Sequence, residues 1–332
     1  MSDGEFDWGG RLRKGIGGAQ RFPQNGWKPF EECKGRRELD CDTDGKCHVV
    51  SSMDSARTNK ENIDSLIRKY GWDSNVVRVR VRGEFPKQED DAFIAIDVIE
   101  QCGSRLYELP EEKGMPFIIF GVDVARFGSD ETIIYLNCFG RCRIVRERRG
   151  QDLMATTGDI VSEYRKVVSE HPEYEGMVYV NIDDTGLGGG VTDRLREVRI
   201  EEKLYNMAVI PINAAEKIET DTSEGRDAAK KYNNLSTHMW ANMRDLMESK
   251  DIMVQDDADT MGQLSSRKYR MASNGKIEIE PKDAMKKRGL DSPDRGDALA
   301  LSLYLGKIKK HTGSAPDANA LAGLAKSNYW SR

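Results

Sequence analysis

The sequence predicts a mixed α/β fold in which helices flank a β-sheet, preceded by an irregular N-terminal extension. Two continuous apolar runs, 117–123 and 177–183, each close on an aspartate and predict buried strands. Apolar residues at helical spacing occupy the segments between and after these runs. Residues 1–50 are instead rich in glycine, charge and turn formers and show no sustained period. Strands that alternate with helices in this way are typical of a mixed α/β sheet.

Two elements are predicted between the extension and the main sheet. Apolar positions at helical spacing predict a helix over 58–70, and Gly71 follows it as a stop signal. Valine and arginine alternate over 76–82, which predicts a strand with one buried face. Residues 83–86 (GEFP) are expected to end this strand. We therefore expect a helix and then a strand ahead of the sheet.

The main sheet is predicted from five strands and two helices. In chain order these are strand 117–123, strand 132–139, strand 143–147, helix 153–169, strand 177–183, a helix opening at Val191, and strand 208–212. Gly140 lies between the second and third strands and predicts a hairpin turn. Three hairpin-like strands followed by helix, strand, helix and strand predict a sheet with both antiparallel and parallel neighbours.

Three further elements are predicted in the C-terminal part. They are a long polar helix over 226–248, a hairpin over 267–279, and a last helix over 293–305. Asn274 and Gly275 supply the hairpin turn. Ser292 is expected as the N-cap of the last helix, with Pro293 in its first turn. Residues 306–332 are small and polar, and we expect a loose tail there.

The composition excludes several classes of protein. The 332 residues include 51 Lys and Arg against 56 Asp and Glu, a net charge of -5, which argues against coating nucleic acid by bulk charge but leaves room for a local basic patch. No apolar run reaches the roughly 18 residues of a membrane span, and the N-terminus lacks the features of a secretory signal. The six cysteines are too scattered for a disulfide scaffold. We therefore expect a reducing cytoplasm and no membrane partner.

Acidic residues lie where predicted strands end and where the last helix begins. Asp123 and Asp183 each end a strand, and Asp184 follows directly. If these two strands are neighbours, Asp123 and Asp183 lie side by side at the carboxyl edge of the sheet. Asp294 and Asp297 are three residues apart, so they share one face of the last helix. Carboxylates gathered at one place are costly unless a cation neutralises them, so we expect a bound cation.

The residue types indicate which cation and which chemistry. Ligands that are all oxygen suit Mg²⁺ or Mn²⁺ rather than zinc. Two such ions about 3.5 to 4 Å apart clamp the attacking and leaving oxygens of a phosphoryl displacement. Simpler roles stay open, because Asp294 also suits the first turn of a helix and Asp184 also suits a turn. Asp123 is harder to explain without a partner, since it follows a very apolar run.

Two more segments lie beside these acids in the sequence. Residues 186–190 (GLGGG) precede a helix but fit neither a dinucleotide fingerprint nor a P-loop, so a tight strand-to-helix turn is the favoured interpretation. Basic residues outnumber acidic ones over 267–288. That stretch either holds a polyanion next to the metals or forms a solvated face.

Three ordered motifs in the sequence resemble a known family. Residues 121–130 (GVDVARFGSD), 182–191 (IDDTGLGGGV) and 292–299 (SPDRGDAL) are similar to the three acidic motifs of the large terminase subunit of tailed bacteriophages. Residues 83–86 are similar to the segment that joins the motor and nuclease domains of that family. The resemblance extends from about residue 51 to residue 305.

The resemblance implies a fold, an activity and a setting. The nuclease part of the family has an RNase H-like fold, uses two Mg²⁺ or Mn²⁺ ions, and cuts concatemeric viral DNA during packaging. This implies an endodeoxyribonuclease with double-stranded DNA as substrate, and with a portal protein and a small terminase subunit as partners. The implied location is the host cytoplasm, with the chain encoded by a phage or prophage.

The resemblance also implies residue roles. By motif, Asp123 would be the ligand that bridges both metals, Asp183 the ligand from the second strand, and Asp294 the ligand from the last helix. Asp297 matches an additional helix acid of related resolvases. Asp184 is the alternative to Asp183 if the strand ends one residue later.

The chain departs from the family in its N-terminal third. Family members begin with an ATPase that carries a P-loop and an apolar strand ending in Asp-Glu, and residues 1–110 show neither. We therefore expect three parts: an irregular segment over 1–90 that resembles the edge of the ATPase domain and its linker, a nuclease domain over 91–305, and a flexible tail over 306–332.

Two rival functions remain open from the sequence. The first keeps the fold but uses the acidic edge to hold Mg-ATP, as in ATPases with an RNase H-like fold, although a pair of phosphate loops is missing. The second is a non-catalytic module that docks on a portal or procapsid through its tail.

Overall fold

The computed structural model describes residues 6–7, 11–12, 38–40, 46–48, 51–55, 57–72, 75–84, 92–103, 109, 113–125 and 130–306. The chain divides into two compact units, Met1–Gln88 and Glu89–Arg332. In the first fifty residues the described parts are short antiparallel pairs, β1 (Phe6–Asp7) with β2 (Arg11–Leu12) and β3 (Glu38–Asp40) with β4 (Lys46–His48). The rest of the predicted irregular extension and tail residues 307–332 lie outside the described residues.

Two short helices form the ordered part of the first unit. Helix α1 (Lys60–Tyr70) is the predicted one: the Asn59 side chain accepts hydrogen bonds from two backbone N–H groups of its first turn, and Gly71 ends it at a φ of 81°. Helix α2 (Asn75–Arg80) occupies the segment predicted as a strand, so that prediction was wrong. Residues Val77 and Val81 are four apart, and both are buried against Ile63 of α1.

The reason for this error is that the valine and arginine pattern has two periods. Alternation at period two also places residues four apart on one helical face. A helix satisfies its own backbone groups, as Val81 N–H does with the Val77 carbonyl at 3.0 Å, whereas a strand needs a neighbour. The segment therefore folds locally, with its two buried valines against α1.

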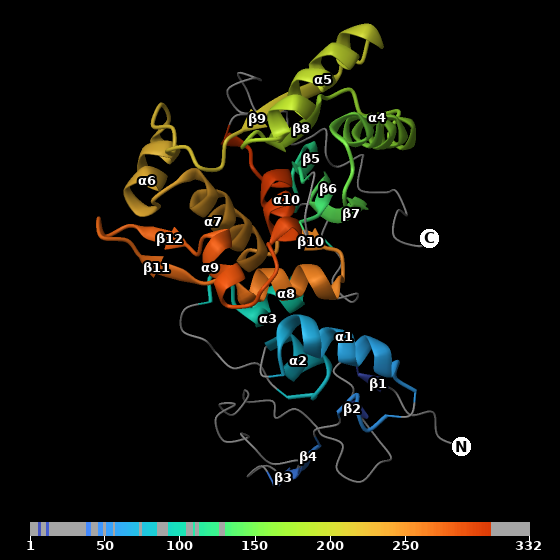
Figure 1. Ribbon diagram of the computed structural model, residues 1–332, viewed down its shortest axis with the longest axis vertical. Helices are drawn as coiled ribbons and strands as arrows, with labels where there is room; N and C mark the ends of the chain where they lie inside the picture. The colour runs from blue at the N-terminus through green and yellow to red at the C-terminus, as the bar shows by residue number, and fades with distance from the viewer. Residues whose placement is uncertain are drawn as a thin grey trace. The chain divides into compact units, whose positions relative to one another are not determined.

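A six-stranded mixed sheet forms the centre of the second unit (Figure 1). Its spatial order is β10 (Met253–Val254), β7 (Arg141–Arg148), β6 (Thr132–Cys138), β5 (Ile118–Asp123), β8 (Val178–Asp183) and β9 (Met207–Ile212). Strands β5, β6 and β7 are antiparallel neighbours, while β8 is parallel to β5, β9 to β8, and β10 to β7. The predicted mixed α/β sheet is confirmed.

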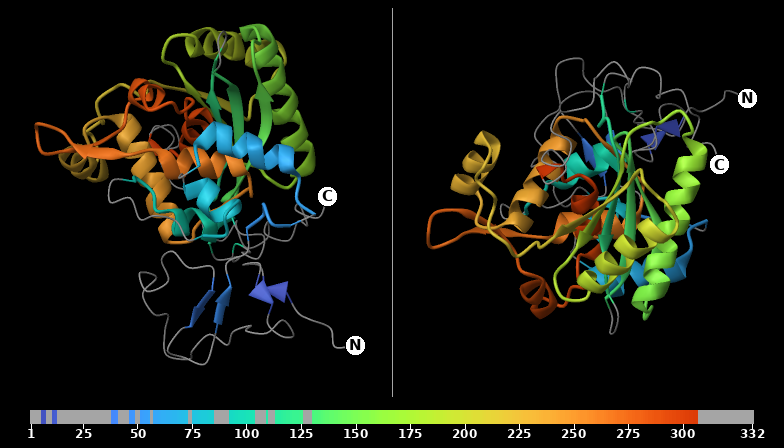
Figure 2. Two further views of the ribbon diagram at one scale, coloured as in Figure 1. Left: turned by 60° about the horizontal axis from the view of Figure 1, so that its bottom comes forward. Right: turned by 90° about the horizontal axis from the view of Figure 1, so that it is seen from above.

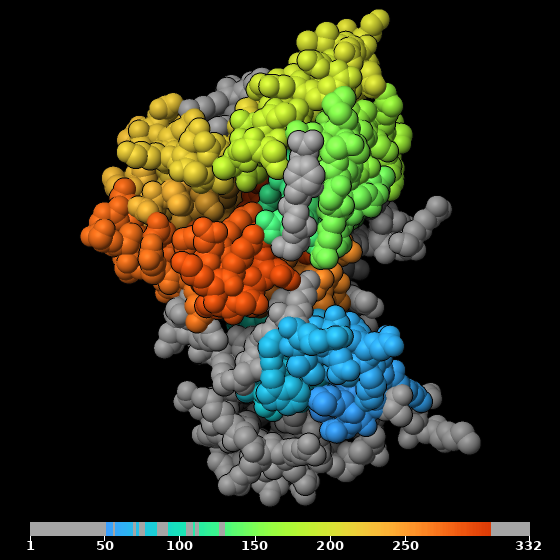
Figure 3. Space-filling view, viewed as in Figure 1, coloured from blue at the N-terminus to red at the C-terminus, as the bar shows by residue number. Residues whose placement is uncertain are grey.

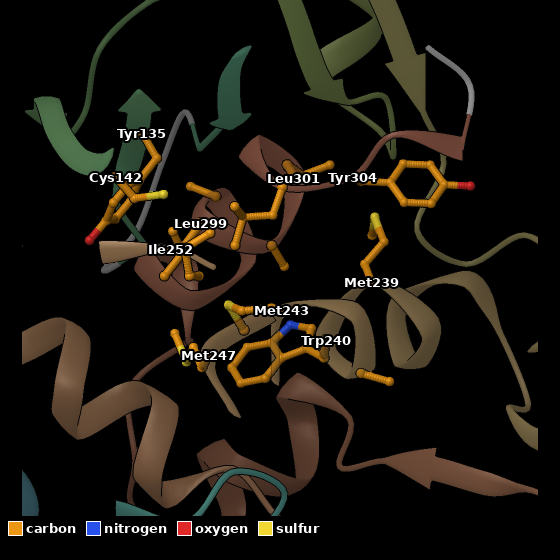
Figure 4. Packing of buried hydrophobic residues seen from close by; sticks show 14 of the residues in the cluster. Tyr135, Cys142, Met239, Trp240, Met243, Met247, Ile252, Leu299, Leu301 and Tyr304 are labelled. Atoms are coloured by element: carbon orange, nitrogen blue, oxygen red, sulfur yellow. The ribbon is translucent and has the colours of Figure 1, made fainter. Parts of the chain in front are cut away.

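Helices cover both faces of this sheet (Figure 2). Helices α4 (Leu153–Glu170) and α5 (Gly188–Glu201) pack on one face, where Ile118, Phe120 and Val122 of β5 are buried. The opposite face packs against α10 (Asp294–Ser302), with α7 (Leu235–Glu248) behind it. Figure 4 shows this second core, in which Trp240 and the methionines of α7 lie below Leu299 and Leu301 of α10.

Helix α10 is fixed on the sheet by close packing and by three asparagines. A Cβ atom on Gly121 of β5 would overlap the carbonyl oxygen of Ala298 and the amide nitrogen of Ser302, so only glycine allows this approach. Free carbonyl groups at the C-terminal end of the helix accept hydrogen bonds from three side-chain amides. The donors are Asn137 of β6 to Ser302 (3.0 Å), Asn181 of β8 to Leu301 (2.8 Å) and Tyr304 (2.9 Å), and Asn242 of α7 to Leu303 (3.0 Å). The helix is therefore held against sliding along the sheet.

The C-terminal part differs from the prediction in two places. The single helix predicted over 226–248 is two helices, α6 (Ser223–Lys231) and α7, because Asn234 caps a new helix by accepting from Thr237 N–H at 2.9 Å. The N-cap of α10 is Pro293, not Ser292, whose hydroxyl donates instead to the Asp294 carboxylate. Both differences follow from side chains that find hydrogen-bond partners the sequence pattern does not reveal.

The remaining elements complete the second unit. The predicted hairpin is present as β11 (Tyr269–Met271) and β12 (Ile277–Ile279), turning at Gly275 with a φ of 75°. Three helices were not predicted: α3 (Ile96–Gly103), α8 (Ala258–Ser266) and α9 (Lys282–Lys287). Within the described ranges, no helix combines the length and apolar character needed to cross a lipid bilayer.

Candidate metal site

The site begins where two central strands end side by side. Val122 of β5 pairs with Ile182 of β8 in parallel register, so Asp123 and Asp183 are the next residues on adjacent strands. Successive side chains along a strand point to opposite faces of the sheet. Asp183 is two residues after Asn181, which bonds to α10, so Asp183 and its neighbour Asp123 lie on the face that α10 covers. Asp123 is only 6% exposed. The sheet thus presents two carboxylates to the start of α10.

Helix α10 adds the other two acids, and a lysine joins them. Lys282, the first residue of α9, places its Nζ 3.0 Å from Asp123 Oδ2, 3.4 Å from Asp294 Oδ1 and 3.0 Å from Asp297 Oδ2. Asp294 also accepts a hydrogen bond from the backbone N–H of Glu131 at 2.9 Å. One ammonium group therefore contacts three carboxylates from two elements, β5, which ends at Asp123, and α10, which begins 171 positions later at Asp294.

The protonation of the site reflects its burial. Burial raises the pKa of Asp123 to about 8, opposed by Lys282 and reinforced by the charges of Asp294, Asp297 and Asp183. Burial also raises the pKa of Asp183, against the hydrogen bonds it accepts from Thr185. Burial alone would lower the pKa of Lys282, but the surrounding carboxylates raise it well above its usual value. The lysine is therefore charged, and Asp123 keeps its proton to a higher pH than an ordinary aspartate.

Asp297 differs from its neighbours because donors occupy both of its oxygens. Its Oδ1 accepts from Arg267 Nη1 at 2.6 Å and from Trp240 Nε1 at 2.7 Å, and Lys282 contacts Oδ2. The Arg267 guanidinium also stacks over the Trp240 ring, 4.4 Å from its centroid. Burial would raise the pKa of Asp297, but Arg267, Lys282 and Trp240 lower it to about 2. Asp297 is thus a charged anchor for the two basic side chains.

Asp184 lies on the other side of the strand end from the cluster. Strand β8 ends at Asp183, and Asp184 Oδ1 accepts from the Thr192 hydroxyl of α5 at 2.9 Å. The glycines that follow form the tight turn that the sequence predicts. A Cβ on Gly188 would overlap the Asp183 carbonyl oxygen, so glycine lets α5 begin directly behind the site.

The basic stretch over 267–288 is largely paired within the protein. Arg267 and Lys282 contact the acids of the site, and Arg270, Lys286 and Arg288 pair with Glu278, Asp130 and Glu280 respectively. The space-filling view shows the segment around α9 at the surface, in orange-red (Figure 3). The contacts of Lys282, Arg267 and Trp240 with the acids of the site were not predicted from the sequence. Only the positive charge of Lys282 and Arg267 pointed to a place beside the acids.

A divalent cation fits this arrangement chemically. The cluster offers carboxylate oxygens and neither imidazole nor thiolate, the donor set that Mg²⁺ and Mn²⁺ prefer. Across the described residues, no three His, Cys, Asp or Glu side chains are already arranged as a metal cage. The carboxylates are instead drawn around the Lys282 ammonium, which supplies positive charge at this place.

Comparisons with known proteins point to one family. The chain is 23% identical to the probable large terminase subunit of Enterobacteria phage P7 over 263 residues. The aligned residues make up 77% of this chain. The matched region spans about half the length of that relative. The resemblance to large terminase subunits is confirmed. No protein-family model matches the sequence.

Solved structures of terminase nuclease domains share the fold. The nuclease domain of the large terminase subunit gp2 of bacterial virus Sf6 matches with a TM-score of 0.50 at 15% identity, over 64% of this chain and 98% of that one. A mutant of that domain, solved with manganese and beta-thujaplicinol, matches with a TM-score of 0.51 at 14% identity over the same shares. The mixed sheet and its flanking helices are therefore the RNase H-like fold of terminase nuclease domains, as the sequence predicts.

Proposed function

We propose that the protein is the metal-dependent endonuclease of a phage DNA-packaging terminase and cuts concatemeric double-stranded DNA. The observation that supports this best is the meeting of Asp123, Asp183 and Asp294 at the carboxyl edge of a terminase-type nuclease fold, around a site of positive charge. The proposal gives the metal-binding roles to these three acids. Asp297 instead holds Lys282 and Arg267 in place. Asp184 holds Thr192 of α5 in place.

The chemistry follows from these groups. Two Mg²⁺ or Mn²⁺ ions, when bound, supply activation of water and neutralisation of charge on the phosphate. Asp123 must release its proton for a cation to bind there, since ligands bind metals in their deprotonated form. Lys282 keeps its charge and is placed to pair with a phosphate oxygen once the carboxylates have another counter-charge.

The setting of this activity comes from the resemblance. It makes a portal protein and a small terminase subunit the expected assembly partners, in the cytoplasm of the phage host. The motor ATPase motifs are absent from residues 1–110, so the proposal assigns DNA cutting, and not ATP-driven translocation, to this chain.

The test is plasmid nicking and linearisation in Mn²⁺, Mg²⁺ or EDTA. We expect cutting that requires metal, is lost in Asp123→Ala, and is retained in Asp227→Ala, which removes an exposed acid of α6. Circular dichroism verifies that both variants fold. Full activity in a folded Asp123→Ala variant would contradict the proposal.

A folded wild-type protein that cuts no DNA would favour one of the rival functions. Calorimetry with Mg-ATP then tests the ATPase alternative. Binding to the portal protein before and after deletion of residues 306–332 tests the docking alternative.

A further inference from the structure

The first turn of α10, which carries Asp294, has no cap of its own. Its N-cap residue is Pro293, and no side chain of the cap position bonds to the turn. The backbone N–H groups of Arg295 and Gly296 instead donate to Gln263 Oε1 of α8, at 2.8 and 3.2 Å. The start of the helix is therefore anchored by a different element.

The Arg295 side chain extends this anchor. It is 5% exposed and lies among four carboxylates, from the segment before β6, from β7 and from α8. The distances are 2.8 Å to Asp257, 2.8 Å to Glu147, 3.4 Å to Asp259 and 3.6 Å to Glu131. Asp257 is also the N-cap of α8, where it accepts from Thr260 N–H at 2.8 Å. One guanidinium thus ties the start of α10 to three neighbouring segments.

Glu131 connects this cluster to the metal site. Its carboxylate accepts a hydrogen bond from Arg149 Nε at 2.8 Å, and it pairs with Arg295 by charge, 3.6 Å from the Arg295 Nε atom. Its backbone N–H donates to Asp294 Oδ2, the carboxylate that we assign to the metal. Arg295 and Asp294 are adjacent in sequence, yet their side chains meet different partners and are joined through the two ends of Glu131.

We infer that Arg295 is a positioning residue of the nuclease site: it holds Glu131 and the first turn of α10 so that Asp294 is oriented for metal binding. This inference rests on the proposed function. A guanidinium has the fork of donors that several carboxylates need, whereas a lysine ammonium is a single point charge. Arg295→Lys keeps the charge but loses the fork that bonds Asp257 and Glu147, so it loosens the first turn of α10 without removing the counter-charge of the four acids.

The test compares Arg295→Lys with Arg244→Lys. Arg244 is a suitable control because it is partly buried and pairs with Asp245 and Glu248, two acids of its own helix α7 that are not assigned to the site. Amide hydrogen exchange of the full chain measures directly how firmly Arg295 and its partners hold the first turn of α10. We expect faster exchange at the amides of residues 131, 295 and 296 in Arg295→Lys, while the variant still unfolds in one cooperative thermal transition. We expect no such change in exchange in Arg244→Lys.

Calorimetry with Mn²⁺ reports on the consequence for the site. We expect Arg295→Lys to weaken Mn²⁺ binding about 10-fold, the lower end of the effect of residues that orient metal ligands. The DNA-cutting rate at saturating Mn²⁺ should change less than the Mn²⁺ concentration needed for half-activity. Glu131→Gln keeps the backbone donor but weakens the ion pair with Arg295, so it should show the same change if Arg295→Lys does not fold.

Each result has a defined meaning. Exchange unchanged at these amides, or Mn²⁺ affinity equal to wild type in a variant with faster exchange, overturns the positioning role. A wild-type protein that binds no Mn²⁺ and cuts no DNA overturns the proposed function instead. The positioning role of Arg295 then falls with it, whatever the exchange rates at residues 131, 295 and 296.

Discussion

Asp123 is a carboxylate that the fold removes from water at the end of a central strand. Its neighbours on β5 are fully buried, and its only basic contact in the described chain is Lys282, which it shares with Asp294 and Asp297. Burial makes the charged form of this group unfavourable, so its pKa is raised and a further positive charge would lower it again. The residue therefore links metal binding, pH and stability.

This linkage predicts a pH dependence in the metal-free protein. The pKa of Asp123 rises from an ordinary 3.8 to about 8 on folding, so the folded state holds a proton that the unfolded state releases. The stabilisation that this provides is complete below about pH 4 and is lost as the pH rises through about 8. Urea unfolding in EDTA should thus show wild type losing more stability between pH 5 and pH 9 than Asp123→Asn. Equal losses in the two proteins would contradict the raised pKa.

The aspartates show how far single residues could be predicted from the sequence. Asp123 and Asp183 were singled out because each ends an apolar run, and the structure places them at adjacent strand ends while Asp184 accepts from Thr192. Their metal-binding role stays a proposal. Lys282 was seen only as one basic residue among several. Its contact with the acids depends on where the unpredicted helix α9 lies, which no local pattern encodes.

At the scale of elements, the contact between α10 and β5 brings the acids of the sheet and the helix together. Gly121 is two residues before Asp123 and lies directly under the backbone of α10. Any side chain there must push the helix away from the sheet. A movement of α10 would separate Asp294 and Asp297 from Asp123.

We therefore expect Gly121→Ala to impair both stability and metal binding. Overpacking of a well-packed core destabilises by about 1 to 3 kcal/mol, and here the overlap is with backbone atoms that have little room to adjust. Urea unfolding and Mn²⁺ calorimetry measure the two effects.

Gly189→Ala is the matched control for this change. Its new Cβ would contact only Asp184 Oδ1, at 3.7 Å, and alanine is a better helix former in α5. We expect its stability to be equal to or above that of wild type. A Gly121→Ala protein as stable as Gly189→Ala, with wild-type Mn²⁺ affinity, would show that α10 does not depend on this close approach.

Elements were predicted best where a strand is buried on both faces and worst where two periods coincide. The strands β5 and β8 are long apolar runs that only a buried strand or helix explains, and glycine and aspartate mark their ends. Residues Val77 and Val81 satisfy a strand and a helix equally, and the choice depends on packing against Ile63. The break between α6 and α7 depends on the Asn234 cap, a polar residue inside what reads as one helix.

At the scale of the whole molecule, every residue assigned to the site belongs to the second of the two compact units. Asp123, Asp183, Asp294 and Lys282 all follow Glu89, and so do both large hydrophobic clusters of the sheet. The first unit has a small cluster of its own, formed by α1 and α2. The second unit therefore has a hydrophobic core of its own and contains all the residues that we assign to the metal site, while the nuclease domain over 91–305 stays a prediction.

This division predicts that residues 89–332 fold and bind metal without the first unit. The fragment keeps the sheet, both layers of helices and all the carboxylates, so its far-ultraviolet circular dichroism should show a cooperative melt. Its Mn²⁺ affinity should equal that of the full chain within about a factor of two, a difference of roughly 0.4 kcal/mol. Asp123→Ala in the same fragment serves as the control for binding at the site. A fragment that folds but binds Mn²⁺ much more weakly would show that the first unit contributes to the site, because the acids themselves are unchanged.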